Sequence, residues 1–404
     1  APSYLPMPEI NLVLFSHEDK GHIQPVLALS RLLRHPSIHV FFVASSSDRA
    51  AVESTGATFV DLASDGAVFN TVDQANLHLS SSLGLDPSTD AKGAHDGFLP
   101  EVVLPATLRL LTTHNLLDRI KALRPTALLG DASCPWVTLL AQLLRIPYIA
   151  SCSSVLMSPI EQEGAFARLR GLPFLQQCAA QLLAEFNIAY DPFHSYCNYS
   201  PFTIVWSTPA FAAPPSPDPT VHYFGAAGFR PRELLPPITS PALLAFLSPP
   251  APTLTPPPHL IYINMGTVVG QQAWTLSLAP LFRTFFEAFP APFFSVILGH
   301  GANTPAADLA GAPANFLLAP SLPQPALLAS RRVSLFITHA GNNSVQEAVA
   351  YAVPMLCLPV FGDQHHNAAR VSALGLGLQI ASPFAPGVSA DMGHVTAAGV
   401  RGRA

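Results

Sequence analysis

Short apolar runs alternate with helix-like segments near the start of the chain. Strand-like Ile10–Phe15 is followed by a polar segment and by Pro25–Leu33, which repeats leucine and alanine at helical spacing; strand-like His39–Ala44 comes next. A strand, a helix and a second strand in this order form a βαβ unit, whose buried parallel strands need apolar residues on both faces. The alternation predicts an α/β fold with a doubly wound sheet and ligands at the carboxyl ends of its strands.

The same alternation recurs in two further groups. The first group is strand-like Ala127–Gly130, helical Trp136–Leu144 and strand-like Tyr148–Ala150. The second group has strand-like His259–Asn264, Phe293–Leu298 and Ser334–Thr338, helical Ser344–Tyr351 and strand-like Pro354–Pro359. We therefore expect two Rossmann-like domains whose parallel sheets face each other across a cleft, which is the first place to look for function.

A proline-rich segment separates the two series. Of the 42 prolines in 404 residues, 15 lie between Pro209 and Pro258. That density disfavours a packed sheet or a helix bundle and is typical of a semi-rigid connection. We predict an N-terminal domain over residues 1–235, a linker over 236–258 and a C-terminal domain over 259–404.

The composition excludes several classes of protein. Apolar residues make up 49% of the chain and charged residues 11%, so the chain has ample core material and is not disordered. The net charge of −5 argues against a nucleic-acid partner, because such proteins carry a basic surplus. Arg145, Pro290 and Pro292 interrupt the longest apolar stretches. We therefore expect no transmembrane helix, which needs about 20 apolar residues.

The cysteines and the N-terminus bear on location. Five cysteines show neither a CxxC pair nor a metal-ligand spacing, as expected in a reducing compartment. Residues 1–9 lack the basic and apolar regions of a secretory signal, although the absence of an initial methionine leaves a removed leader open. We predict a cytoplasmic monomer.

The densest polar cluster runs from Thr338 to Glu347. A strand ends at Thr338, the chain turns, and a helix is expected to begin near Ser344. Free amides and the positive dipole end make a helix N-terminus an anion site, to which His339 and Asn343 could add hydrogen bonds. Glu347 could bind the hydroxyls of a ribose. The alternative is a capping box of Ser344 and Glu347, which needs no ligand.

This cluster lies in a longer segment, Leu322–Gln364, that resembles the C-terminal signature of family-one, UDP-sugar-dependent glycosyltransferases of the GT-B fold. The signature runs roughly W-x-P-Q, T-H-x-G-x-N-S-x-x-E, G-V-P-M, then D-Q with a following N. The matching residues are Pro323, Gln324, Thr338, His339, Gly341, Asn343, Ser344, Glu347, Val353, Pro354, Met355, Asp363, Gln364 and Asn367.

The resemblance implies a donor site in the C-terminal domain. It would place Gln324 on the uracil edge, His339, Asn343 and Ser344 on the diphosphate with Gly341 in the turn, Glu347 on the ribose, and Asp363 and Gln364 on the sugar hydroxyls. Thr267, after the strand Leu260–Asn264, resembles the family residue that approaches the phosphates, although a simple turn is an equal alternative.

Three positions depart from the signature. Ser321 stands where the family has a tryptophan that stacks on uracil, Asn342 replaces a second tryptophan, and Ala352 replaces a glycine. Stacking of an aromatic side chain on a base contributes about 1–3 kcal/mol in nucleic-acid proteins. We expect weaker nucleotide binding than in relatives that keep the tryptophan.

A second constellation lies near the N-terminus. Gly21, His22 and Pro25 resemble the family's G-H-x-x-P motif, in which the histidine deprotonates the acceptor. Asp131 ends a strand in Leu-Leu-Gly-Asp and resembles the aspartate that supports this base. Without the resemblance, His22 would be a turn or capping residue, and Asp131 could be an N-cap.

The resemblance implies an inverting transfer of a hexose from a UDP-sugar to a hydroxyl of a small, largely apolar acceptor, with an N-terminal acceptor-binding domain. Gln364 favours glucose. The sequence has no D-x-D motif, so we expect a metal-independent reaction without a cofactor. The alternatives are another GT-B enzyme, such as a GlcNAc transferase or UDP-GlcNAc epimerase, a non-catalytic nucleotide-sugar binder, and a two-lobed solute-binding protein. Only 40 residues follow Gln364, fewer than is usual in the family, which predicts an abbreviated or incomplete C-terminus.

Overall fold

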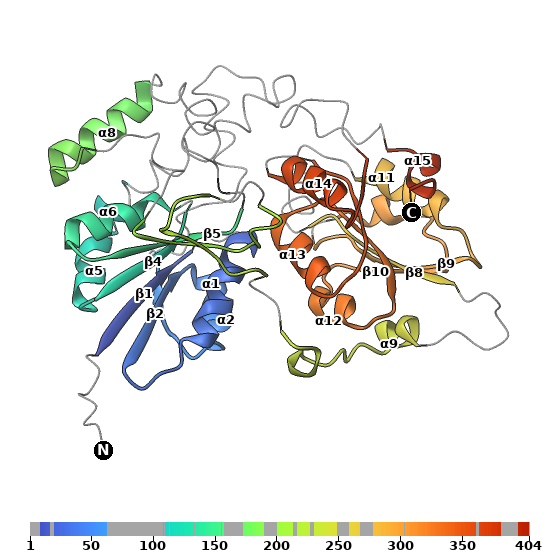
Figure 1. Cartoon of the computed structure of the whole chain (residues 1–404), viewed down its shortest axis with the longest axis horizontal. Coiled ribbons are helices and arrows are strands. Elements are labelled where there is room, and N and C mark those ends of the chain that lie inside the picture. Colours follow the sequence, from blue (N-terminus) through green and yellow to red (C-terminus); the bar gives the residue numbers. More distant parts are fainter. Residues whose placement is uncertain are drawn as a thin grey trace. The chain divides into compact units, whose positions relative to one another are not determined.

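The computed structural model describes residues 9–16, 20–62, 108, 110–112, 114–132, 134–154, 156, 173–189, 200–212, 216–226, 230–248, 258–266, 278–302, 304–360, 363–380 and 395–403. Two compact units make up the chain: residues 1–87 with 93–227, and residues 88–92 with 228–404. Each unit contains one parallel sheet, as Figure 1 shows.

The first unit is built on a seven-stranded parallel sheet in the order β3-β2-β1-β4-β5-β6-β7. The strands are β1 Ile10–Phe15, β2 Ile38–Ala44, β3 Thr58–Asp61, β4 Ala127–Asp131, β5 Tyr148–Cys152, β6 Phe202–Val205 and β7 Val221–Tyr223. The helices are α1 Lys20–Leu32, α2 Arg49–Glu53, α5 Leu116–Ala122, α6 Pro135–Leu144 and α8 Pro173–Phe186, with a 3-10 turn at Ser46–Asp48.

Strand β1 shows why the chain folds around this sheet. Leu12 and Leu14 belong to one buried cluster together with residues of α1 and α2. Val13 and Phe15 point to the opposite face and join a second cluster with residues of α5 and α6. Because side chains alternate along a strand, an uninterrupted apolar run is buried on both faces only when helices cover both. Figure 1 shows α1 and α2 on one side of this sheet and α5 and α6 on the other.

The second unit has a six-stranded parallel sheet in the order β10-β9-β8-β11-β12-β13. Its strands are β8 His259–Asn264, β9 Phe294–Gly299, β10 Phe316–Ala319, β11 Val333–Thr338, β12 Met355–Cys357 and β13 Gly377–Gln379. Its helices are α9 Pro241–Leu247, α11 Ala279–Ala288, α12 Gln324–Ala329, α13 Asn342–Ala350, α14 Gln364–Ala373 and α15 Ala397–Arg401, with 3-10 turns at Arg232–Leu234 and Ala306–Leu309.

The core of the second unit follows the same rule as the first. Ile261 and Ile263 of β8 pack in one cluster with phenylalanines of α11 and with Val400 of α15. Tyr262 lies between them in sequence and faces the other side, where its ring stacks on Phe336 of β11 at 4.9 Å between centroids. The predicted fold class, two parallel-sheet α/β domains, is confirmed.

The described part of the proline-rich segment contains helix α9 and the 3-10 turn at Arg232–Leu234. Residues 228–235, placed with the first domain in the sequence analysis, group with the second unit. Within the predicted linker, Ser240 caps helix α9 by accepting a hydrogen bond from the Leu243 amide, and Pro241 occupies the first helical turn. Proline is favoured at this position because the amide proton that it lacks would have no acceptor within the helix. Residues 249–257 lie outside the described part of the chain.

None of the helices in the described ranges combines the length and the apolar character that crossing a bilayer requires.

Gly130, near the end of β4, provides a test of how β4 packs against α6. A methyl group at position 130 would lie 2.7 Å from a methyl of the buried Val137 side chain in α6. We expect Gly130→Ala to lower the melting temperature, with a loss of about 1–3 kcal/mol typical of an overpacked core, and Val137→Ala in the same chain to restore part of it. Thermal unfolding followed by circular dichroism measures both. Gly21→Ala is the control, because its new methyl would meet nothing within 4 Å; equal melting temperatures for Gly130→Ala and this control would contradict the prediction.

Candidate functional site

The strand order of each sheet reverses direction once. In the first unit the reversal lies between β1 and β4, and in the second unit between β8 and β11. At such a point the two strands lead to elements on opposite faces of the sheet, so the carboxyl ends of the strands are open to a ligand. The predicted site residues of each unit lie at its reversal.

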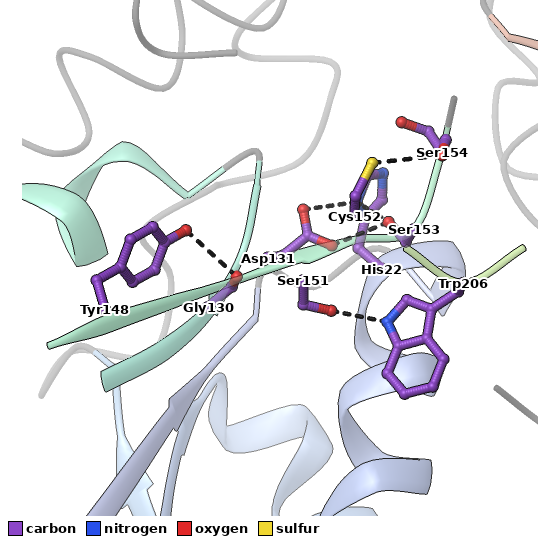
Figure 2. A network of polar contacts seen from close by, with 9 residues as sticks. All are labelled: His22, Gly130, Asp131, Tyr148, Ser151, Cys152, Ser153, Ser154 and Trp206. Carbon is purple, nitrogen blue, oxygen red and sulfur yellow. Dashed lines mark hydrogen bonds and ion pairs between the residues drawn. The ribbon is translucent and has the colours of Figure 1, made fainter. Parts of the chain in front are cut away.

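His22 and Asp131 meet at the reversal of the first unit. His22 lies in the first turn of α1, directly after β1, and Asp131 is the last residue of β4. The distance between His22 Nδ1 and Asp131 Oδ1 is 3.0 Å. The histidine side chain is 25% exposed and the aspartate 1%, so a buried carboxylate supports an imidazole that a ligand can reach (Figure 2).

Ser153 completes this cluster, and the sequence analysis did not single it out. It follows β5, the next strand after β4 in the sheet. Its hydroxyl oxygen lies 2.9 Å from His22 Nδ1 and donates to Asp131 Oδ2 at 2.9 Å. The signal was available: parallel neighbouring strands end at the same edge, so a polar residue after β5 falls beside one at the end of β4.

The alternative of Asp131 as an N-cap is wrong. Helix α6 begins at Pro135, and its N-cap position is Cys134. Asp131 instead accepts the Cys134 amide with its backbone carbonyl at 2.9 Å, while its carboxylate turns to His22 and Ser153.

The surroundings of His22 Nδ1 define the chemistry of the ring. An ionised carboxylate only accepts hydrogen bonds, and the single hydroxyl proton of Ser153 is directed to Asp131 Oδ2. Both neighbours of Nδ1 are therefore acceptors, so Nδ1 carries the ring proton. The lone pair of the neutral ring is then on Nε2, which is the arrangement of a general base.

His339 lies at the strand-order reversal of the second unit. It follows β11 and lies against two glycines, Gly266 after β8 and Gly341 before α13; a methyl group on either glycine would overlap the imidazole ring. Burial lowers the pKa of His339 to about 4, although the backbone of Asn264 opposes the shift. The ring is thus neutral near pH 7 and can serve an anion as a hydrogen-bonding group but not as a cation.

Helix α13 begins earlier than the sequence pattern predicts. It starts at Asn342 with Gly341 in the N-cap position, so Ser344 is the third helical residue and the capping-box alternative is wrong. The first amides of the helix belong to 342–344, and this places the anion-binding end of α13 directly after His339. Asn343 lies in the first turn of α13.

A polar network joins the remaining donor-site candidates. Gln324 Oε1 accepts from the hydroxyl of Tyr262 and from the side-chain Nδ2 of Asn264, both at 3.1 Å. Gln324 Nε2 donates to Ser344 Oγ at 3.2 Å and to Glu347 Oε2 at 2.9 Å. All four hydrogen-bonding positions of this side-chain amide are thus used within the protein. In this structure the side chain is hydrogen-bonded to Glu347, and its place at the edge of a base stays a prediction.

Two residues predicted to bind the sugar lie at the start of α14. Gln364 is 4% exposed, and its Oε1 accepts the Val360 amide at 2.9 Å. Asp363 Oδ2 accepts from Asn367 Nδ2 at 3.2 Å, and the same nitrogen donates to the carbonyl of Ala340 at 3.0 Å. Asn367 therefore ties this turn to the one that carries His339. Thr267 lies outside the described residues.

Among the residues that the structure describes, no three His, Cys, Asp or Glu side chains are grouped so that they could hold a metal ion.

Comparisons with known proteins bear on the family and the fold. Residues 300–384 match the UDP-glucoronosyl and UDP-glucosyl transferase family. An uncharacterized UDP-glucosyltransferase of Bacillus subtilis, YdhE, is 35% identical over 121 residues, which are 30% of this chain and 29% of that protein. The anthocyanidin 3-O-glucosyltransferase of Hordeum vulgare is 41% identical over 106 residues, 26% of this chain and 23% of that protein. The matched segments thus span less than a third of these relatives.

Solved structures extend the likeness to the whole chain. The glycotransferase of kitacinnamycin has a TM-score of 0.68 at 22% identity, over 98% of this chain and 90% of that one. The calicheamicin glycosyltransferase CalG4 has a TM-score of 0.65 at 17% identity, over 98% and 89%. The fold is that of the GT-B glycosyltransferases, and the resemblance that the sequence motifs indicate is confirmed.

Glu347 has a measurable cost for stability. Burial raises the pKa of Glu347 from 4.5 to about 7, and the hydrogen bond from Gln324 opposes the shift. The unfolded chain releases this proton near pH 4.5 and the folded chain only near pH 7, so the folded state loses stability as the pH rises between the two values. Above pH 7 the loss reaches at most about 3 kcal/mol.

We expect Glu347→Gln to melt at a higher temperature than the wild type at pH 8 and at nearly the same temperature at pH 5. Differential scanning fluorimetry at the two pH values measures the difference. Glu287→Gln removes the same charge from an exposed side chain of α11 and should have no effect at either pH. The pKa argument would be overturned if the melting temperature of Glu347→Gln exceeded that of the wild type by no more at pH 8 than at pH 5.

Proposed function

We propose that this chain, whose second unit carries the signature of UDP-sugar-dependent glycosyltransferases, transfers a hexose from a UDP-sugar to a hydroxyl group of a small, largely apolar acceptor. The observation that carries the proposal is the 3.0 Å contact of His22 Nδ1 with the buried Asp131 carboxylate. This contact leaves Nε2, on a ring that is one-quarter exposed, as the base for an acceptor hydroxyl.

The second unit supports the donor half of the proposal. The first turn of α13, with His339, Gly341, Asn343 and Ser344, would bind the diphosphate through hydrogen bonds and the helix dipole. Because His339 is neutral, the positive end of α13 supplies the electrostatic stabilisation of the leaving UDP.

The ribose and the sugar would lie beyond the diphosphate. Glu347 would accept hydrogen bonds from the ribose hydroxyls, with Thr267 near the phosphates. Asp363 and Gln364 would bind the sugar, and the resemblance at Gln364 favours glucose.

In the proposed reaction, His22 Nε2 takes the proton of the acceptor hydroxyl while the hydroxyl oxygen attacks the anomeric carbon. The new carbon–oxygen bond forms as the bond from that carbon to the UDP oxygen breaks, and UDP leaves with the bonding electrons. Asp131 stabilises the imidazolium that results. A single displacement of this kind inverts the anomeric centre, and no step requires a metal ion or a cofactor.

The thiols support a place in the cytoplasm for this reaction. Cys178 and Cys357 are free in the described part of the chain, which is typical of a reducing compartment.

Release of UDP from UDP-glucose, measured against a panel of phenolic, terpenoid and sterol alcohols, tests the proposal. We expect turnover with at least one acceptor, and we expect His22→Ala to lower kcat about 100-fold or more with the dissociation constant for UDP unchanged in calorimetry. His39→Ala replaces an exposed histidine of β2 and is the control.

Three results separate the alternatives. Turnover undiminished in His22→Ala would refute the base assignment. UDP binding without turnover on any acceptor would favour the non-catalytic binder. Binding of dTDP in place of UDP would show that the donor carries thymidine and not uridine. A structural neighbour, the spinosyn rhamnosyltransferase SpnG, was solved in complex with thymidine diphosphate.

A further inference from the structure

We infer that Ser153 is a positioning residue of the proposed transfer, which sets the orientation and the tautomer of the His22 base through Asp131. The inference rests on the proposed function of His22. Its basis is a closed triangle of polar contacts among His22, Asp131 and Ser153, with sides of 3.0, 2.9 and 2.9 Å (Figure 2).

The triangle gives both carboxylate oxygens of Asp131 a hydrogen-bond donor. Oδ1 faces His22 Nδ1, and Oδ2 accepts from the Ser153 hydroxyl. A carboxylate that is 1% exposed has little water to replace such a donor, and hydrogen bonds to the charged form favour ionisation. Ser153 therefore gives Oδ2 its donor and fixes the plane of the Asp131 carboxylate.

The same hydroxyl also acts on the histidine ring. Since its proton is directed to Asp131 Oδ2, its lone pairs face His22 Nδ1 at 2.9 Å. The N–H of Nδ1 thus points between two acceptors on different strands. One acceptor would allow the ring to tilt about a single hydrogen bond, whereas two acceptors define its plane and hence the direction of the Nε2 lone pair.

The backbone on both sides of Ser153 is held in place. Ser151 is paired in register with Asp131 across β4 and β5, and its hydroxyl accepts from the indole of Trp206 at 2.8 Å. The Trp206 amide donates to the Cys152 carbonyl at 3.1 Å, and Cys152 Sγ contacts the Ser154 carbonyl at 3.4 Å. Ser153 is itself buried, so its hydroxyl occupies a position fixed before any substrate arrives.

The test compares Ser153→Ala with Ser153→Thr, which keeps the hydroxyl. We expect Ser153→Ala to lower kcat about 10-fold to 100-fold, the effect of one positioning hydrogen bond on a general base, while KM for UDP-glucose stays within about 2-fold. Ser153→Thr should recover most of kcat. Ser154→Ala, which alters the neighbouring serine, is the matched control and should behave as the wild type.

Two further measurements separate positioning from a general loss of structure. In Asp131→Asn the effect of Ser153→Ala should be much smaller than in the wild type, because the hydroxyl and the carboxylate hold His22 Nδ1 as one unit; two additive losses would overturn the inference. Nitrogen NMR of the imidazole, assigned by difference from His22→Ala, should show Nδ1 protonated in the wild type and a mixture of tautomers in Ser153→Ala. An unchanged tautomer together with an unchanged kcat would overturn it as well.

The outcomes also distinguish this inference from the function on which it rests. Loss of turnover in His22→Ala with wild-type kcat in Ser153→Ala refutes the role of Ser153 alone. Turnover that survives both substitutions refutes the assignment of the base. If Ser153→Ala melts at a much lower temperature than the wild type, Ser153→Cys is the variant to test, because it nearly keeps the side-chain volume but has a weaker donor. An unchanged kcat in Ser153→Cys would count against the inference.

Discussion

Both candidate sites depend on the point at which a parallel sheet reverses its strand order. At β1 and β4, and again at β8 and β11, adjacent strands end together while the chain leaves towards opposite faces. The ends of these strands are therefore a place in each unit where side chains of distant sequence positions meet and a ligand can bind. His22 and Asp131 are 109 positions apart and come together only because β1 and β4 pair. Residues after β8 and β11 meet for the same reason.

The two reversals place histidines in opposite surroundings. His22 is partly exposed and has a buried carboxylate and a hydroxyl at Nδ1, so the protonated ring that forms during proton transfer is stabilised. His339 is enclosed by two glycines, and burial lowers its pKa to about 4, so its protonated form is disfavoured. A histidine near the strand-order reversal thus suits proton transfer in one unit and neutral hydrogen bonding in the other.

The sequence predicted the sheets better than the side-chain contacts. The prediction for His259–Asn264 agrees with β8 at both ends, because an apolar run buried on two faces has sharp limits. Asp131 was identified by its place after such a run. Helix starts were less accurate: α1 begins five residues before Pro25, since tertiary packing holds a turn that the proline would not favour alone. Ser153 was missed because its contacts follow from the order of the strands and not from a local motif. The saturated amide of Gln324 was missed because its partners come from other strands and helices, and no local pattern encodes such contacts.

The network around Gln324 shows what this arrangement costs and what it supplies. Glu347 is half-buried beside an uncharged partner, and its pKa of about 7 means that ionisation opposes folding near neutral pH. A chain selected for stability alone would place an apolar or amide side chain there. Retaining a carboxylate, and using Gln324 to aim one of its oxygens, is reasonable if a ligand with two adjacent hydroxyls compensates for the buried charge by hydrogen bonding to it. In the absence of the family's tryptophan at Ser321, such polar contacts, together with the amides of α13, would carry more of the nucleotide's binding energy than base stacking does.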